Sequence, residues 1–124
     1  MSTRVKLDEN LQRVVVTVLP EPQTVTVAET VLRLTNQRPE LGGWDWIIDI
    51  RNPHDKATPE ELDQIAAAFN AARSKQSYTV FISDDPVTYD RCALMEIKFL
   101  NRRHLVAKTL PQAMALLPWT MPSI

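Results

Sequence analysis

The amino-acid sequence predicts an α/β fold with a single mixed β-sheet of about five strands. Two apolar runs near the N-terminus predict a hairpin, and further apolar runs alternate with helical segments in the order ββαβαβαβα. Strands that alternate with helices pair in parallel through right-handed crossovers. The chain of 124 residues is long enough for one domain with its own core. We place this domain at residues 1–117, and a C-terminal tail at 118–124.

The N-terminal hairpin is predicted from residues 3–7 and 13–19. These segments read TRVKL and RVVVTVL, and a polar turn that begins with DEN separates them. Pro20 and Pro22 end the second strand, because proline has no amide hydrogen to donate to a sheet.

Four segments begin like helix N-termini. In three of them a Glu or Gln follows the cap residue by three positions, so that the two side chains form a capping box. In two of them a proline, Pro59 or Pro86, occupies the first helical position, where a missing amide hydrogen has no cost. The four cap residues are Thr26, Thr58, Asp85 and Thr109.

The helix predicted from Thr58 to about Ser74 has the clearest pattern, because its apolar residues fall on one stripe. The last helix, at 110–117, repeats this pattern on a smaller scale. The segment from Pro86 to Phe99 is apolar all round, which predicts that other parts of the fold cover it well.

Three further runs, rich in β-branched and aromatic residues, predict the remaining strands. They read WDWIIDI at 44–50, YTVFIS at 78–83 and HLVAKTL at 104–110. Alternate residues of a strand point to opposite faces of the sheet. In the first run, one face carries Trp44, Trp46, Ile48 and Ile50 and is predicted to be buried, and the other carries Asp45, Ile47 and Asp49.

The composition excludes several classes of function. Lys and Arg total 14 and Asp and Glu total 15, so there is no electrostatic case for binding nucleic acid or an anionic membrane. No apolar run is long enough for a membrane span, and the N-terminus lacks a signal region. One cysteine, Cys92, excludes a disulfide framework, and two glycines exclude a phosphate-binding loop. We therefore expect a cytoplasmic protein without a metal or other cofactor.

Polar residues at the predicted ends of the strands raise the question of a catalytic site. Asp49, Asp84 and Lys108 would meet at one edge of the sheet, as in a magnesium-dependent phosphoryl-transfer or phospho-accepting protein. The simpler interpretation is structural, because Asp84 suits a loop and Asp49 suits a pair with Arg51. His54 is interpreted as a solvated loop residue, since no nucleophile is fixed within its reach.

Two other groups have structural interpretations. Cys92 lies in an apolar segment and is expected to be a buried, inert thiol. Arg102, Arg103 and His104 join a helix to a strand, and are expected to interact with the helix's carbonyl end and to solvate the turn. Anion binding is the alternative for this second group.

The chain resembles the SpoIIAA-like, or STAS-like, superfamily along nearly its whole length. The resemblance rests on the hairpin, on WIIDIRN before a loop and helix, and on the closing HLVAKTLPQAMALL. It implies a mixed sheet with helices largely on one side, and binding of partner proteins. One branch is switched by phosphorylation at the position that matches Thr58, and a related branch binds lipids. The chain departs from the signalling pattern, since it reads DKATPEEL in place of an Asp-Ser pair followed shortly by Gly, which favours Thr58 as a helix cap.

We predict a non-catalytic STAS-like binding domain whose partner is another protein. The alternative is a carrier of a small molecule or lipid, with the helix at 86–100 lining its pocket. The apolar tail, with Trp119 and Met121, favours docking on the domain or on a second copy in a homodimer. The predicted binding edge consists of Asp49, Arg51, Asn52, His54, Thr58 and Asp84, with Thr58 as the candidate phospho-acceptor.

Overall fold

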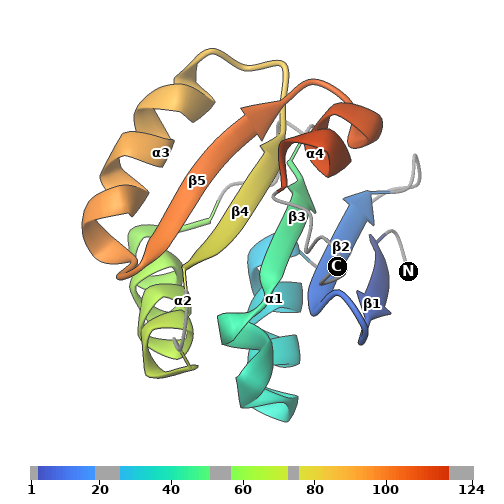
Figure 1. Cartoon of the computed structure of the whole chain (residues 1–124). Helices are drawn as coiled ribbons and strands as arrows, with labels where there is room; N and C mark the ends of the chain where they lie inside the picture. Colours follow the sequence, from blue (N-terminus) through green and yellow to red (C-terminus); the bar gives the residue numbers. More distant parts are fainter. Residues whose placement is uncertain (1–2, 19–25, 51–56, 73–75, 118–124) are drawn as a thin grey trace.

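The structure is a computed structural model of the whole chain, and it describes residues 3–18, 26–50, 57–72 and 76–117. Within these residues, five strands form one sheet, and four α-helices and a short 3-10 helix pack around it (Figure 1). The strands are β1 (Thr3–Asp8), β2 (Arg13–Val18), β3 (Asp45–Asp49), β4 (Ser77–Ile82) and β5 (Arg102–Ala107). The helices are α1 (Val27–Gln37), η1 (Pro39–Gly43), α2 (Pro59–Ala72), α3 (Val87–Lys98) and α4 (Leu110–Leu116).

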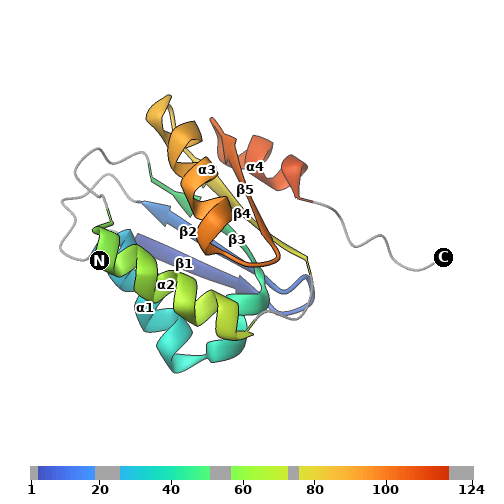
Figure 2. The ribbon, with the colours of Figure 1, turned by 90° about the vertical axis from the view of Figure 1, so that its left-hand side faces the viewer.

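The strands lie in the sheet in the same order as in the chain, β1-β2-β3-β4-β5. β1 and β2 are antiparallel and every other neighbouring pair is parallel, so the predicted mixed sheet and element order are confirmed. Each crossover moves one strand in the same direction, and right-handed crossovers of this kind bring their helices to the same face. Accordingly α1, α2 and α3 cover one face of the sheet, and α4 covers the other (Figure 2).

The predicted alternation along β3 divides the core between these two faces. Trp46 and Ile48 lie in the larger core beneath α1, α2 and α3, and Ile47 lies in the smaller core beneath α4. The indole of Trp46 is completely buried, and its ring nitrogen donates to the carbonyl of Leu41 (2.8 Å). Its ring centroid lies 5.2 Å from that of Phe69, so β3 and α2 are joined by an aromatic contact.

Helix capping follows the sequence pattern closely. At Thr58 the box is reciprocal: the hydroxyl accepts from the amide of Glu61 (3.1 Å), and the Glu61 carboxylate accepts from the amide of Thr58 (2.9 Å). Thr26 and Thr109 each accept from the amide three residues later (3.1 and 3.3 Å). These caps fix where α1, α2 and α4 begin.

The start of α3 differs slightly from the prediction. The helix begins at Val87, and Pro86 precedes it with helical dihedral angles. The carboxylate of Asp85 accepts from the amide of Val87 (3.0 Å), so Asp85 still satisfies one of the free amides at this helix start.

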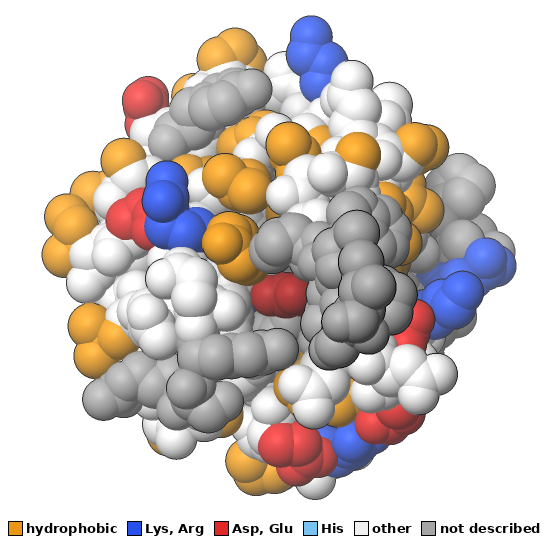
Figure 3. Space-filling view, in the orientation of Figure 1, with side chains coloured by type: hydrophobic (Ala, Val, Ile, Leu, Met, Phe, Trp, Pro, Cys, Tyr) orange, Lys and Arg blue, Asp and Glu red, His pale blue; other side chains and the backbone are white. Residues whose placement is uncertain are grey.

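The expectation that α3 is well covered is wrong. On this helix, Val87, Leu94 and Ile97 are 50, 62 and 78% exposed. The reason is the position of α3, which packs mainly against β5, the edge strand, so that nothing described lies beyond it. Figure 3 shows hydrophobic side chains along the left side of the molecule, where α3 lies.

The interpretation of Arg102, Arg103 and His104 as a solvated turn is also wrong. β5 begins at Arg102, two residues before the predicted strand, and Arg102 and His104 point into the core while Arg103 is exposed. The guanidinium of Arg102 lies 4.7 Å from the ring centroid of Phe69. Burial lowers the pKa of Arg102 to about 10, so the group remains charged at neutral pH.

Arg102 is retained in the core by hydrogen bonds to three segments. Its terminal nitrogens donate to four acceptors, which join β5 to η1, to the residue between η1 and β3, and to β4. The acceptors are the carbonyls of Gly42 (2.9 Å), Trp44 (2.7 Å) and Tyr78 (2.9 Å) and the hydroxyl of Thr79 (3.0 Å).

Candidate functional site

A cavity of about 750 Å³ lies between the sheet and the three helices α1, α2 and α3. Its floor is formed by residues of β3, β4 and β5, and its walls by residues of α1, α2 and α3, some of which, such as Leu94, are also exposed to solvent. Most of the lining side chains are apolar, and the volume lies in the range of known small-molecule sites. The floor includes Ile48, Thr79, Phe81, Ser83 and His104, and the walls include Val31, Leu62, Phe69, Arg91, Leu94, Met95 and Lys98.

α3 is joined to α2 near its C-terminal end. The side-chain amide of Asn70 on α2 donates to the carbonyl of Lys98 (3.0 Å) and accepts from the amide of Leu100 (2.8 Å). The ammonium of Lys98 also forms an ion pair with the carboxylate of Asp63, which lies in the N-terminal half of α2. These contacts fix the C-terminal end of α3, while the rest of this helix rests on β5 and leaves the space beside α2 unfilled.

His104 is the most unusual polar residue of the cavity wall. It is 6% exposed, and its ring lies near those of Phe81 (centroids 6.1 Å, stacked) and Phe99 (4.9 Å, edge-on). Burial, with a smaller contribution from the charge of Arg102, lowers the pKa of His104 to about 3. The imidazole is therefore neutral at neutral pH. Among the described residues, no group forms a hydrogen bond with its Nδ1.

The end of the cavity beyond β4 carries hydroxyl groups. The hydroxyls of Ser83 and Thr88 are buried and lie 2.8 Å apart, and Ser83 Oγ also accepts from the amide of Asp85 (3.0 Å). The exposed carboxylates of Asp84 and Asp85 line this end of the cavity. In contrast with the His104 end, these hydroxyls have partners within the protein.

The predicted binding edge is described only in part. Arg51, Asn52 and His54 lie outside the described residues. Asp49 is 1% exposed, and alternation along β3 places it on the face of Ile47, under α4, whereas Asp84 is exposed and lines the cavity on the opposite face. The structure therefore does not bring Asp49 and Asp84 together on one surface.

Two further predicted residues have structural roles. Thr58 is exposed, and its hydroxyl caps α2. Lys108 is exposed at the end of β5, and its amide donates to the side chain of Gln112 (3.0 Å). In the part of the chain that the structure describes, no group of three or more His, Cys, Asp or Glu side chains could hold a metal ion.

Cys92 is confirmed as a buried residue on α3. Burial, with a smaller contribution from Glu96, raises the pKa of its thiol to about 11. The thiol is protonated at neutral pH, as expected for an inert cysteine.

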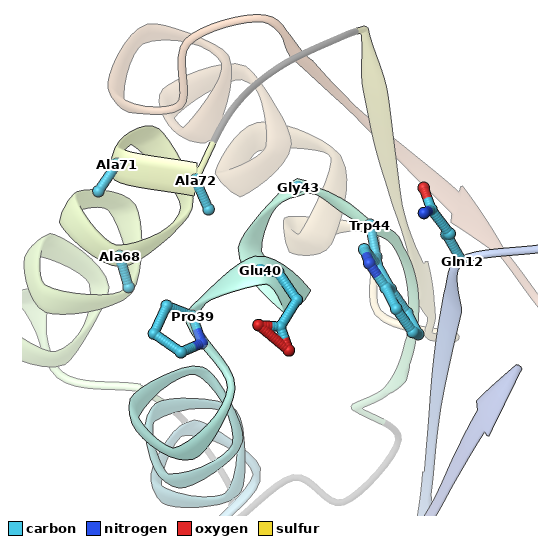
Figure 4. Close-up of a pocket in the computed structure, with 8 residues that line it drawn as sticks. All are labelled: Gln12, Pro39, Glu40, Gly43, Trp44, Ala68, Ala71 and Ala72. Carbon is cyan, nitrogen blue, oxygen red and sulfur yellow. The ribbon is translucent and has the colours of Figure 1, made fainter. Parts of the chain in front are cut away.

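A second, smaller hollow of about 420 Å³ lies between η1 and the C-terminal half of α2. Figure 4 shows Ala68, Ala71 and Ala72 of α2 on one side of it, and Pro39 and Glu40 of η1 on the other. The carboxylate of Glu40 is paired with Arg38 (2.7 Å). None of the described residues that line this hollow carries a buried polar side chain, so the cavity beneath α3 is the stronger candidate site.

The polar cavity-lining residues that sequence reasoning did not identify include His104 and the Ser83–Thr88 pair. The run RRH could have indicated that His104 is buried. If the strand begins at Arg102, alternation places Arg102 and His104 on one face of the sheet. Comparison with protein-family models, with curated proteins and with solved structures finds no match for the chain. None of the described helices is long and apolar enough to cross a membrane.

Proposed function

We propose that this chain is a STAS-like domain that works by binding, and that it holds an apolar small molecule or a lipid chain in the cavity beneath α3. The observation that carries the proposal is the cavity itself, with its volume of about 750 Å³ and its mainly apolar lining. Binding an apolar ligand here removes its surface from water and fills space that the protein's own side chains leave open.

The arrangement of the elements supports the resemblance on which the proposal rests. A mixed sheet with three of its four helices on one face is what the STAS-like resemblance implies. The lipid-binding branch of that superfamily is the precedent for an apolar ligand in such a fold. In this chain the space for such a ligand lies between α2 and α3, and both helices line it.

Two variants on α3 test the proposal. Met95 lines the cavity, and Met95→Trp fills it, whereas Ile97 is 78% exposed and Ile97→Trp changes only the outer surface. We expect wild type and Ile97→Trp to bind the neutral dye N-phenyl-1-naphthylamine with equal affinity, and Met95→Trp to lose roughly tenfold or more. Equal affinity of all three proteins, with their folds intact by circular dichroism, would refute the proposal.

Native mass spectrometry of the protein purified from cells gives a second measurement. An apolar ligand bound to wild type and Ile97→Trp, and absent from Met95→Trp, is the expected result. A clean mass for all three proteins, together with no dye binding, contradicts a carrier function.

The second candidate function is binding of a protein partner. The exposed side chains of Leu94, Ile97 and Leu100 support it, because such an apolar surface is typical of an interaction site. A second copy of the chain is the partner that we test first. Sedimentation equilibrium should show a dimer that Ile97→Asp dissociates; a wild-type monomer at high concentration would exclude this partner.

A further inference from the structure

We propose that the cavity beneath α3 binds an apolar chain that carries one carboxylate group, as a fatty acid does, and that Arg91 pairs with this carboxylate. This inference rests on the proposed function and specifies the charge of the ligand for the same cavity. It starts from a cationic side chain of the cavity lining that forms no ion pair with any described residue.

The described lining of the cavity includes two cationic side chains, Arg91 and Lys98. The ammonium of Lys98 is paired with Asp63 on α2. No described residue forms a hydrogen bond or an ion pair with the guanidinium of Arg91, which is half-buried on α3. A guanidinium has five donors in a planar fork that matches the two oxygens of a carboxylate. The cavity therefore offers one position for a singly charged anion.

A hydroxyl donor accompanies Arg91 on the same face of α3. Thr88 precedes Arg91 by three residues, so the two side chains are neighbours on the helix surface, and both line the cavity. Each hydroxyl has one hydrogen, and in the pair of Ser83 and Thr88 only one hydroxyl can donate to the other. The remaining hydrogen has no acceptor among the described residues. An oxygen of a carboxylate paired with Arg91 can supply one.

The lining residues that follow Arg91 provide the surface for the ligand's apolar chain. They include Leu94, Met95 and Phe99. Phe99 lies eight residues after Arg91, so the lining extends about 12 Å along the helix direction. The imidazole of His104 packs against Phe99 and is neutral, because burial lowers its pKa to about 3. This end of the cavity therefore suits the apolar end of the ligand.

The acidic residues of the lining oppose a second negative charge on the ligand. Asp84 and Asp85 line the cavity, but both are exposed, so water and salt screen their charges. The carboxylate of Asp85 also accepts from the amide of Val87 at the start of α3 (3.0 Å). One unpaired cation beside two screened acids favours a carboxylate over a dianionic phosphate.

The test compares three ligands of the same chain length and different charge: decanoate, 1-decanol and decylammonium. Each is titrated against the protein at neutral pH by displacement of N-phenyl-1-naphthylamine. Wild type should bind decanoate more tightly than decylammonium. Arg91→Met keeps an unbranched side chain but removes the charge. We expect this variant to bind decanoate roughly tenfold more weakly than wild type does, with unchanged affinity for 1-decanol.

Two further variants make the test specific. Arg33 is exposed on α1 and is not part of the cavity lining, so Arg33→Met removes the same charge and should bind all three ligands as wild type does. Arg91→Glu reverses the charge at the site and should bind decylammonium more tightly than decanoate. The affinity for 1-decanol shows whether the cavity of each variant is intact, and the preference of wild type for decanoate depends on no variant.

The outcomes separate the two proposals. If none of the three ligands displaces the dye from wild type, the cavity is not a site for simple apolar chains, and the proposed function fails with the inference. If 1-decanol binds but Arg91→Met binds decanoate as tightly as wild type does, only the role of Arg91 is wrong. Tighter binding of decylammonium than of decanoate by wild type would refute the inference, because Asp84 and Asp85 would then set the charge preference.

Discussion

The neutral state of His104 predicts how the stability of the domain depends on pH. In the folded protein its pKa is lowered to about 3, and in the unfolded chain it returns to the ordinary value near 6.5. Between these values the unfolded chain binds a proton that the folded protein does not bind. Stability therefore rises with pH in this window, and it is lost as the pH falls from 6.5 toward 3.

The magnitude follows from the two pKa values. In the steep part of the window one proton changes the free energy of unfolding by about 1.4 kcal/mol per pH unit. At pH 7 the histidine of the unfolded chain is only beginning to bind its proton. Between pH 7 and pH 5, His104 alone should therefore lower the free energy of unfolding by about 2 kcal/mol. This is a large share of the roughly 5–15 kcal/mol that stabilises a typical domain.

Urea unfolding at pH 7, 6 and 5, followed by circular dichroism, measures this loss. His104→Phe removes the titrating group, so its stability should fall by about 2 kcal/mol less than that of wild type over this range. His54→Gln is the matched control, because it removes the other histidine and should keep the wild-type pH dependence. Parallel curves for wild type and His104→Phe would show that His104 is not held neutral by burial.

Three further predictions concern stability. Arg102→Met leaves four acceptors without their donor, and we expect a loss of about 3–5 kcal/mol in urea unfolding; a loss below about 1 kcal/mol would contradict the role given to these bonds. Gly42→Ala places a Cβ 2.9 Å from the carbonyl oxygen of Ala68, so it should cost about 1–3 kcal/mol, while Ala71→Ser on the exposed side of α2 should change little. Thr58→Ala removes one cap and should cost about 1 kcal/mol without changing dye affinity, and a change in affinity would instead connect Thr58 with the ligand.

The order of elements and the helix starts could be predicted because they depend on local patterns. The Thr58 box needs only two residues of one chain segment, and alternation along β3 needs only the pleat of a strand. The sequence therefore placed Trp46 in the core and Thr58 at a cap without any knowledge of their neighbours.

The site could not be predicted because it depends on contacts between distant segments. The sequence predicts a solvated Arg102, because it does not show that the carbonyls of Gly42 and Trp44 lie beside this side chain. The apolar residues of α3 predict a buried helix, because the sequence does not show that its neighbour β5 is the edge strand. The cavity is lined by residues of the sheet and of three helices that lie far apart in the sequence, so no local pattern predicts it.

The order of the strands also has a consequence for synthesis of the chain. Because each strand after β1 pairs with the one that precedes it, every new strand finds its pairing edge already present when it leaves the ribosome. No strand has to wait for a later segment to be inserted between it and its neighbour, so each parallel pairing closes only the single helical crossover that joins the two strands. β5 completes the sheet last, and the cavity acquires its His104 wall only at that step.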